Sequence, residues 1–267
     1  MIGVEVRRQA KRRRTLYSFL ALLAIPTIVL VALLVNGGPD TTGRQPELVD
    51  VASDSGLNFA LFMLVATSQF LLVVVVSLFA GDAVASEAQW GSLRYLLTRP
   101  IARARLLRTK LVVAGAYAAA AVLLVPLASL AMGTVAFGWK SVQTPLAGAI
   151  GVNTGLSRLA LATGYVMVTM AVVVALSFWF STRTDAPLSA VGGAVVLVVV
   201  SEILDQVSAL KMLRNVLPTH YWLAWLDLLV DPVDAGQMTT GLLQMVPWVV
   251  VPLALAFRGF SRKDVLS

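Results

Sequence analysis

Cysteine is absent from the sequence, and histidine occurs only once. The chain therefore has no disulfide, no thiolate metal site and no cysteine nucleophile, and the lone His220 has no second histidine or cysteine with which to hold a metal ion. Charged residues make up 13% of the chain, about half of the share that is usual in soluble domains. Because 58% of the residues are hydrophobic and lie in long blocks, lipid must be the solvent for much of the chain. The sequence predicts an integral membrane protein with membrane lipids as its neighbours.

The basic residues give the chain a formal net charge of +7, which would also suit a protein that binds nucleic acid. They cluster, however, at the ends of the apolar blocks, where positive charge sets the orientation of membrane helices. A nucleic-acid-binding face would instead spread along a soluble helix or sheet. We therefore expect no nucleic-acid partner.

Six apolar stretches approach or exceed the length of about 20 residues that a helix needs to cross the hydrocarbon core of a membrane. They cover residues 16–35, 57–80, 111–137, 156–180, 187–205 and 241–257. The first is too long for the apolar part of a signal peptide and shows no cleavage site, so we expect a retained helix. The last contains Pro247 and Pro252, whose freed backbone groups need partners, so we expect it to pack against other helices. The predicted fold class is all-α: a polytopic membrane protein with six transmembrane helices in a single transmembrane domain, residues 1–267.

Lysine and arginine are concentrated on one side of the predicted spans. That side holds the N-terminal segment, the connection after the second span, Arg183 and the segment after the sixth span, whereas the opposite side carries mostly carboxylates. Basic segments next to membrane helices stay in the cytoplasm. We therefore predict that the N- and C-termini are both cytoplasmic and that the chain is a multi-pass protein of the bacterial cell membrane.

The predicted cytoplasmic connection between the second and third spans, about residues 82–110, contains a helical pattern. Ser86 and Gln89 have the spacing of a capping box, in which each side chain bonds a backbone N–H at a helix start. Trp90, Leu93 and Leu97 then recur at helical spacing. This pattern predicts a short amphipathic helix that begins at Ser86.

Pro100 ends the amphipathic pattern, because proline disfavours helix at the residue before it. A second, basic helix is expected from about Ile101 directly into the third span. The amphipathic helix suits either of two roles: it lies among lipid headgroups with its arginines beside anionic lipid, or it docks a cytosolic partner. Periodicity alone leaves both roles open.

The same connection contains a spaced set of residues that resembles a family signature. The set is Glu87, Gly91, Ser92, Leu93, Arg94, Leu96, Leu97, Pro100, Arg103 and Lys110. It resembles the signature of ABC-2-type transporter permeases, in which E-x-x-x-G-(T/S)-L, L-L, P-(I/V)-x-R and a later lysine link the second and third spans. Ser92 stands where threonine is frequent in that family. The resemblance is strongest between about Asp82 and Leu111, and the basic N-terminal helix and the span count agree with it.

The resemblance implies that the helix around Ser86–Leu97 is a coupling helix, seated against a separate cytosolic ABC ATPase subunit. The residues implied to contact that ATPase, or to act as hinges beside it, are Glu87, Trp90, Gly91, Leu93, Arg94, Leu97, Pro100 and Arg103. It also implies that two permease halves, a second copy or a homologous permease, pair around one pathway. By analogy with the family, we expect export.

The sequence contains no G-x-x-x-x-G-K-(S/T) loop with which to cradle phosphates. We therefore expect no cofactor on this chain, and ATP and Mg²⁺ on the partner subunit. The sequence also lacks the H-E-x-x-H and G-x-S-x-G signatures and a convincing pair of carboxylates in mid-membrane. We expect no catalytic residue and no enzymatic activity in this chain.

The predicted outer connection, about residues 206–240, is rich in aromatic residues, among them Tyr221 and Trp222 next to His220. Tryptophan and tyrosine favour the boundary between membrane and water. The segment is therefore interpreted either as an aromatic belt on short interfacial or re-entrant helices, or as an outer gate to which these three residues contribute.

Polar side chains inside the spans are candidate functional residues, because burying them in lipid is costly. Glu202 and Asp205 lie one turn apart near the outer end of the fifth span. They either reach the interface, or attract a cationic substrate or gate by protonation. Asn58 and Gln69 in the second span either line a pathway or form hydrogen bonds between helices.

Two other classes of function stay open. One is a secondary transporter driven by an ion gradient, although the sequence shows no convincing repeat of the kind that is common in such folds. The other is a membrane anchor or regulatory subunit. For an anchor, loss of the partner ATPase would change only the localisation of a protein, whereas for a permease it would abolish transport.

Overall fold

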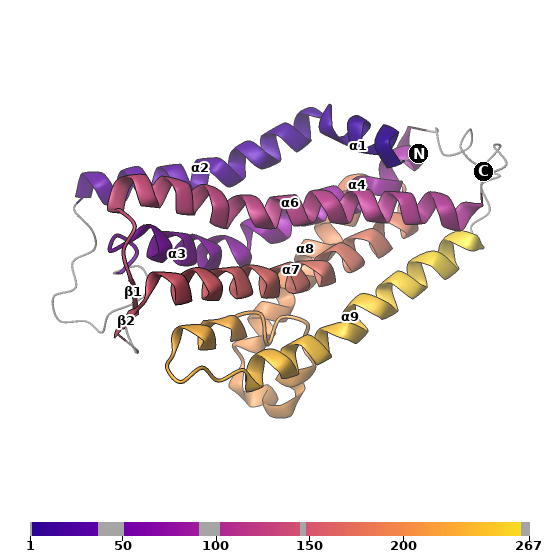
Figure 1. The fold of residues 1–267 in the computed structure, drawn as a ribbon. Helices are drawn as coiled ribbons and strands as arrows, with labels where there is room; N and C mark the ends of the chain where they lie inside the picture. Colours follow the sequence, from indigo (N-terminus) through magenta and orange to yellow (C-terminus); the bar gives the residue numbers. More distant parts are fainter. Residues whose placement is uncertain (1, 37–50, 91–101, 145–147, 263–267) are drawn as a thin grey trace.

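The structure is a computed structural model that describes residues 2–36, 51–90, 102–144 and 148–262. The α-helices are α1 (Ile2–Ala10), α2 (Arg13–Asn36), α3 (Gly56–Ser68), α4 (Leu71–Gln89), α6 (Arg103–Phe137), α7 (Val152–Arg183), α8 (Pro187–Asp205) and α9 (Gly236–Ser261). Two short strands, β1 (Val142–Thr144) and β2 (Gly148–Ile150), pair antiparallel between α6 and α7. Two 3₁₀ helices, η1 (Ser208–Val216) and η2 (Ala224–Leu229), lie between α8 and α9 (Figure 1).

Six of these helices, α2, α4, α6, α7, α8 and α9, are long and apolar enough to cross a membrane. Helices α4 and α8 have 19 residues each, which is about 28 Å at a rise of 1.5 Å per residue. The hydrocarbon core of a bilayer is about 30 Å thick. The predicted all-α, multi-pass architecture with six membrane-length helices is therefore confirmed.

The two helices after the predicted cytoplasmic connection agree closely with the sequence-based expectation. Helix α6 begins at Arg103 and runs without interruption to Phe137, so the basic helix does lead directly into the third span. Helix α8 begins at Pro187 and ends at Asp205, at both predicted bounds. Proline is favoured in the first turn of a helix because no N–H is needed there.

The expected second span, residues 57–80, is wrong in its bounds, because two helices occupy this region. Helix α3 ends at Ser68, and α4 begins at Leu71, after Gln69 and Phe70. The hydroxyl of Ser68 donates to the carbonyl of Val65 (3.1 Å), so a side chain satisfies a backbone group beside the break. Apolar residues flank the break on both sides, which is why hydropathy alone joins the two helices into one span.

The expected helix start at Ser86 is also wrong. Ser86 lies inside α4, where its hydroxyl donates to the carbonyl of Asp82, four residues earlier, at 2.7 Å. A serine inside a helix can bond back to its own backbone in this way, and the sequence pattern is then identical to that of a cap. Helix α4 ends at Gln89, Trp90 follows it in a turn, and the rest of the predicted amphipathic helix lies outside the described residues.

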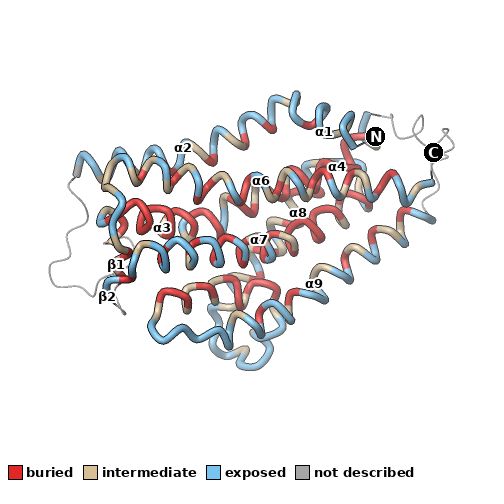
Figure 2. The backbone as a smooth tube through the Cα atoms, viewed as in Figure 1, coloured by how far each residue is buried: buried red, intermediate tan, exposed pale blue. Residues whose placement is uncertain are grey.

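The centre of the bundle is built from α4 and α7. In their most apolar stretches, 72% of the α4 residues and 67% of the α7 residues are buried, against 17% in α2 and 22% in α9. Helix α4 packs against α6, α7 and α8, while α2 and α9 lie on opposite flanks (Figures 1 and 2). Helix α9 packs mainly against α7, as expected for a proline-containing helix among neighbours. Of its two prolines, Pro252 is buried and Pro247 is exposed.

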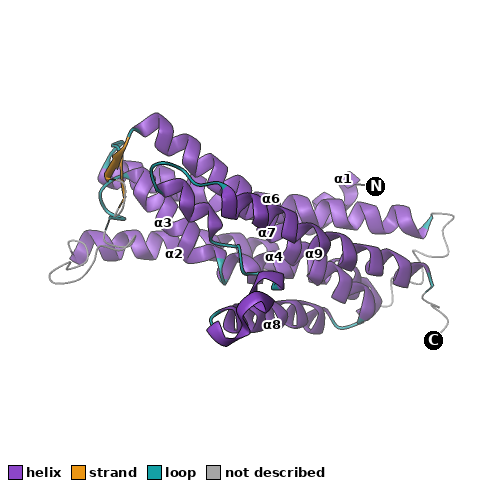
Figure 3. Ribbon diagram, turned by 90° about the horizontal axis from the view of Figure 1, so that it is seen from below, coloured by secondary structure: helices purple, strands orange, loops and turns teal. Residues whose placement is uncertain are grey.

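The two ends of the bundle differ. The start of α1, the end of α4, the start of α6 and the end of α9 lie together at one end, which we call the common end (Figure 1). The β-hairpin lies at the opposite end (Figure 3). Asn58 at the start of α3 holds this hairpin, since its amide donates to the carbonyl of Gln143 (2.6 Å) and its amide oxygen accepts from the Gln143 N–H (3.0 Å).

Candidate functional site

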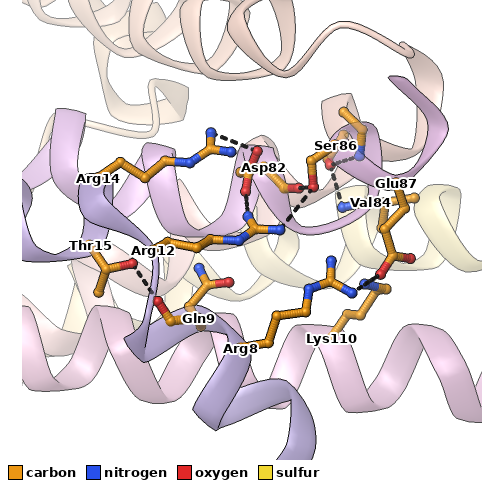
Figure 4. A network of polar contacts seen from close by, with 12 residues as sticks. Arg8, Gln9, Arg12, Arg14, Thr15, Asp82, Val84, Ser86, Glu87 and Lys110 are labelled. Carbon is orange, nitrogen blue, oxygen red and sulfur yellow. Dashed lines mark hydrogen bonds and ion pairs between the residues drawn. The ribbon is translucent and has the colours of Figure 1, made fainter. Parts of the chain in front are cut away.

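The common end contains a network of buried charges, which we call the common-end network (Figure 4). Helix α1, the loop that follows it and the first turn of α2 supply three arginines and one carboxylate, while α4 supplies two carboxylates and a serine and α6 supplies a lysine. Its members are Glu5, Arg8, Arg12, Arg14, Asp82, Ser86, Glu87 and Lys110.

Glu87 and Lys110 form the innermost part of this network. Lys110 Nζ lies 2.7 Å from Glu87 Oε1, and both side chains are only 2% exposed. Arg8 Nη1 lies 2.7 Å from the same oxygen, and Glu5 Oε1 lies 3.4 Å from Lys110 Nζ. A buried charge without a partner costs several kcal/mol. The pairing therefore ties the end of α4, the start of α6 and α1 together.

Asp82, one turn before Ser86, forms the second part of the network. Its carboxylate is 1% exposed and pairs with Arg12 and with Arg14, whose Nη1 lies 2.8 Å from Oδ1. Burial lowers the pKa of Arg12 below its ordinary value, and the positive charges of Arg8 and Arg14 lower it further. Arg12 is thus drawn out of water against α4, and Asp82 is the carboxylate that compensates its charge.

Helix α7 contacts α4 just before the innermost ion pair. The hydroxyl oxygen of Ser181 accepts hydrogen bonds from the backbone N–H groups of Val84 and Ala85, each at 3.0 Å. These two bonds attach α4 to α7 one turn before Glu87, next to the common-end network.

Three of the eight residues implied to contact an ATPase fall in the described part of the chain. Glu87 is buried in the network, and Trp90 at the end of α4 is 80% exposed. Arg103 starts α6, and its guanidinium donates to the carbonyl of Ser261 at the end of α9 (3.3 Å). Gly91, Leu93, Arg94, Leu97 and Pro100 lie outside the described residues.

Sequence reasoning missed the network, because it assigned the N-terminal arginines only to membrane orientation. The available signal was the pair of carboxylates, Asp82 and Glu87, at the end of an apolar stretch. Carboxylates in such a position need basic partners. The basic segment at residues 7–14 supplies them.

A second polar site lies at the end of α8 remote from the common end. It is a pocket of about 130 Å³, which we call the α8 pocket. Its polar lining comes from the break between α3 and α4, from the end of α8 and from the segment that follows α8: Gln69, Glu202, Asp205, Gln206, Thr219 and His220. Trp222 and Leu223 complete the wall.

Three of the six polar lining residues, Asp205, Thr219 and His220, have hydrogen-bond partners. Asp205 Oδ1 lies 2.5 Å from His220 Nδ1 and 3.3 Å from Arg214 Nε. The hydroxyls of Thr219 and Ser201 are 2.7 Å apart. Asp205 is therefore held in place by partners from the segment after α8.

The α8 pocket brings together five of the residues that the sequence singled out as a possible pathway or gate. These are Gln69, Glu202, Asp205, His220 and Trp222. Tyr221 lies beside them with its ring edge-on to that of His220, at a centroid distance of 4.6 Å. Its backbone carbonyl accepts a hydrogen bond from the buried hydroxyl of Tyr165 (2.7 Å).

Asn58 lies apart from this group, at the start of α3 against the β-hairpin. It is 3% exposed, and both ends of its amide are bonded to the Gln143 backbone. We therefore assign Asn58 to hairpin attachment. The aromatic side chains of Trp222 and Trp225 are buried within the protein, so they do not form an exposed belt.

The packing of membrane-length helices around buried charges defines a multi-pass α-helical membrane protein. Within the described residues, no group of three or more histidine, aspartate or glutamate side chains is arranged to hold a metal ion. The chain belongs to the family DUF2705, since the sequence profile described as "Protein of unknown function (DUF2705)" matches residues 45–266. No curated protein matches the chain. The matched region includes Asp82, Glu87, Lys110 and the α8 pocket, whereas the arginines of α1 precede it.

Proposed function

We propose that this chain is the membrane-spanning permease subunit of an ATP-driven transporter of the ABC-2 type. The observation that carries the proposal is the buried ion pair between Glu87 and Lys110. These residues are the first and last of the signature that resembles ABC-2 permeases. Their pairing joins the two helices that enter and leave the signature segment.

In this proposal, the common end faces the cytoplasm and the segment between Gln89 and Arg103 meets a separate ATPase subunit. The positive-inside rule supports this orientation, because basic residues of α1, α6 and α9 gather at the common end. Trp90, at the start of this segment, is 80% exposed, and it is suited to contact a partner. ATP and Mg²⁺ bind to the partner subunit.

The common-end network would make α1, α4 and α6 respond together to such a partner. A force on the segment acts on the ends of α4 and α6, which the Glu87–Lys110 pair joins. Helix α4 packs against α6, α7 and α8 in the bundle centre, so displacement of its end is transmitted to neighbouring spans. The hydrogen bonds from Val84 and Ala85 to Ser181 tie this part of α4 to α7, so movement of α4 is passed to α7 as well. A second copy of the chain or a homologous permease would complete the pathway, with export as the direction.

A second candidate function is transport driven by an ion gradient. The break between α3 and α4 favours it, because discontinuous helices commonly form the substrate and ion sites of secondary transporters. Gln69, at this break, lines the α8 pocket. A membrane anchor or regulatory subunit is the remaining alternative.

The proposal is tested by purifying the tagged full-length chain from its native host in mild detergent and identifying co-purifying proteins by mass spectrometry. We expect a stoichiometric subunit with a phosphate-binding Walker A loop, whose ATPase activity changes when it binds this chain. A chain that purifies alone under several mild conditions would contradict the proposal. Transport by the chain alone, driven by a pH or sodium gradient in liposomes, would establish the second candidate.

A matched pair of variants tests the role of the buried ion pair. Lys110→Met removes a buried charge from α6, whereas Arg108→Met removes an exposed charge two residues earlier on the same helix. We expect the first variant to retain the ATPase subunit but to lose transport-coupled ATP hydrolysis, and the second to behave as the wild type. If ATP hydrolysis is coupled to transport equally well in both variants, the ion pair takes no part in coupling.

A further inference from the structure

The 3₁₀ helix η1 (Ser208–Val216) carries apolar side chains that the described part of the chain leaves largely uncovered. Met212 is 82% exposed, Leu213 and Val216 are exposed as well, and no residue of η1 is buried. Val207, just before η1, is also exposed. Single exposed apolar residues are normal, but a contiguous group of them indicates a surface for a protein partner or for lipid. Helix η1 belongs to none of the six membrane-length helices, so crossing the membrane does not account for this exposure.

The two helices next to η1 carry apolar residues that face lipid. Val200 and Ile203 of α8 are exposed, and so are Leu243 and Val246 of α9. Both helices are long and apolar enough to cross a membrane, so these side chains lie in lipid. Helix η1 packs against α8, its last residue is hydrogen-bonded to α9, and it lies at the outside of the bundle (Figure 2). The exposed side chains of η1 are therefore continuous with surfaces that lipid covers.

Hydrogen bonds from α9 place the end of η1 within the depth of the membrane. The side-chain amide of Gln244 donates to the carbonyls of Val216 (3.0 Å) and Leu217 (2.8 Å), and the indole N–H of Trp248 donates to the Val216 carbonyl (3.0 Å). At a rise of 1.5 Å per residue, Trp248 and Gln244 lie about 15 and 21 Å along α9 from Arg258, its only charged residue. Both distances are shorter than the hydrocarbon core, which is about 30 Å thick. The end of η1 thus lies beside a part of α9 that is surrounded by lipid.

The polar groups of η1 are satisfied, with one exception. Backbone groups at membrane depth need hydrogen-bond partners because lipid offers none, and Gln244 and Trp248 supply them to the end of η1. Arg214 pairs with Asp205, with 3.3 Å between Nε and Oδ1. Lys211, in contrast, is exposed and has no ion pair with any residue that the structure describes. An uncompensated cation beside exposed apolar side chains is typical of an interfacial segment that binds anionic lipid.

We propose that η1 is an interfacial element that docks on anionic phospholipid in the leaflet remote from the common end. Its exposed apolar side chains enter the boundary between headgroups and acyl chains, and the ammonium group of Lys211 pairs with a headgroup of net negative charge. Because Arg214 joins η1 to Asp205, the same element attaches one wall of the α8 pocket to the lipid. This inference goes beyond the proposed function. It depends neither on an ATPase nor on which side of the membrane the common end faces.

The absence of cysteine allows a single thiol to be introduced and labelled with a fluorophore. Met212→Cys labels η1, Val250→Cys labels an exposed apolar position of α9, and Asp231→Cys labels an exposed polar position after η2. Each full-length variant is placed in nanodiscs and quenched by nitroxide-labelled lipid or by iodide in the water. We expect the label at Met212 to behave like that at Val250: quenched by the lipid and shielded from iodide. Leu213→Cys repeats the measurement in case one variant folds poorly.

Two results would overturn the docking of η1 on lipid. Iodide quenching at Met212 equal to that at Asp231 would show that η1 lies in water. Shielding from both quenchers would show that a protein surface, such as a second copy of the chain, covers η1.

A second comparison tests the role of Lys211. In the Met212→Cys chain, nitroxide-labelled phosphatidylglycerol is compared with nitroxide-labelled phosphatidylcholine at the same low mole fraction. We expect the anionic lipid to be enriched about fivefold beside the label, as expected for one lysine next to an anionic surface. Lys211→Gln should abolish this preference, whereas Lys140→Gln, at an exposed lysine before β1, should retain it. Equal quenching by the two lipids when Lys211 is present would overturn its pairing with an anionic headgroup.

Discussion

Glu87 at the end of α4 and Lys110 near the start of α6 meet in a buried ion pair, with 2.7 Å between Oε1 and Nζ. Arg8 of α1 reaches the same carboxylate oxygen, also at 2.7 Å. A pair in this position constrains the two helices that enclose the signature segment, whatever that segment binds. Its removal should therefore affect stability as well as the proposed coupling.

Glu87→Gln and Lys110→Met should each lower the free energy of unfolding by about 3–5 kcal/mol, because each leaves a buried charge without its main partner. The double variant should lose less than the sum of the two, since it removes both charges. Denaturant unfolding in detergent, followed by circular dichroism, measures all three. Additive losses would show that the two side chains do not interact.

Asp82→Asn should detach the N-terminal helix, because Arg12 and Arg14 both pair with this carboxylate. Arg12 is already drawn out of water, so its charge would be left desolvated without compensation. Loss of hydrogen bonds between charged groups is expected to speed amide exchange in α1 about tenfold or more. Hydrogen–deuterium exchange measured by mass spectrometry checks this. Asp54→Asn, an exposed position before α3, is the control and should leave exchange in α1 unchanged.

Gly241→Ala should loosen the packing of α9 against the segment that forms the α8 pocket. A methyl group at Gly241 would lie 2.3 Å from the Tyr165 hydroxyl and 2.6 Å from Tyr221 Cβ, so the neighbours must move. Overpacking of this kind costs about 1–3 kcal/mol. Gly192→Ala in α8 is a matched control, because a methyl group there meets nothing within 4 Å. It should be neutral or stabilising by about 0.5–1 kcal/mol, and a thermal unfolding comparison that ranks the two variants equally would refute the packing argument.

Asn58→Ala should destabilise the end of the bundle that contains the β-hairpin, while leaving the α8 pocket intact. The substitution removes both bonds to the Gln143 backbone and leaves the peptide N–H and C=O groups without partners, at a cost of about 1–3 kcal/mol for each buried group. Faster amide exchange in β1 and α3 would be the signature. If the variant is as stable as the wild type but its transport is altered, Asn58 instead lines the transport pathway.

The sequence determined five of the six membrane-length helices, because these depend on the local density of apolar residues and on local stop signals. The exception is the second expected span, where α3 and α4 replace one helix. Pro187 and the polar residues from Asp205 onward set both ends of α8. The continuity of α6 from Arg103 was likewise predictable, because no proline or glycine stands between the basic turns, which end at Lys110, and the apolar turns that follow. Gly115 and Pro126 lie further along, and the helix accommodates both. The part of the predicted amphipathic helix after Trp90 lies outside the described residues and stays a prediction.

Only the tertiary structure decided where the polar groups lie relative to one another. The break at Gln69 follows no proline or glycine signal, and it depends on how α3 packs against α6 while α4 packs against α7. The carboxylate of Glu87 could be assigned to an exposed contact or to a buried pair from the sequence alone, because either suits a charge at the end of an apolar stretch. The pairing with Lys110 and Arg8 exists because three helices converge at the common end. Long-range convergence of this kind is set by packing across the whole bundle, which no local pattern of residues records.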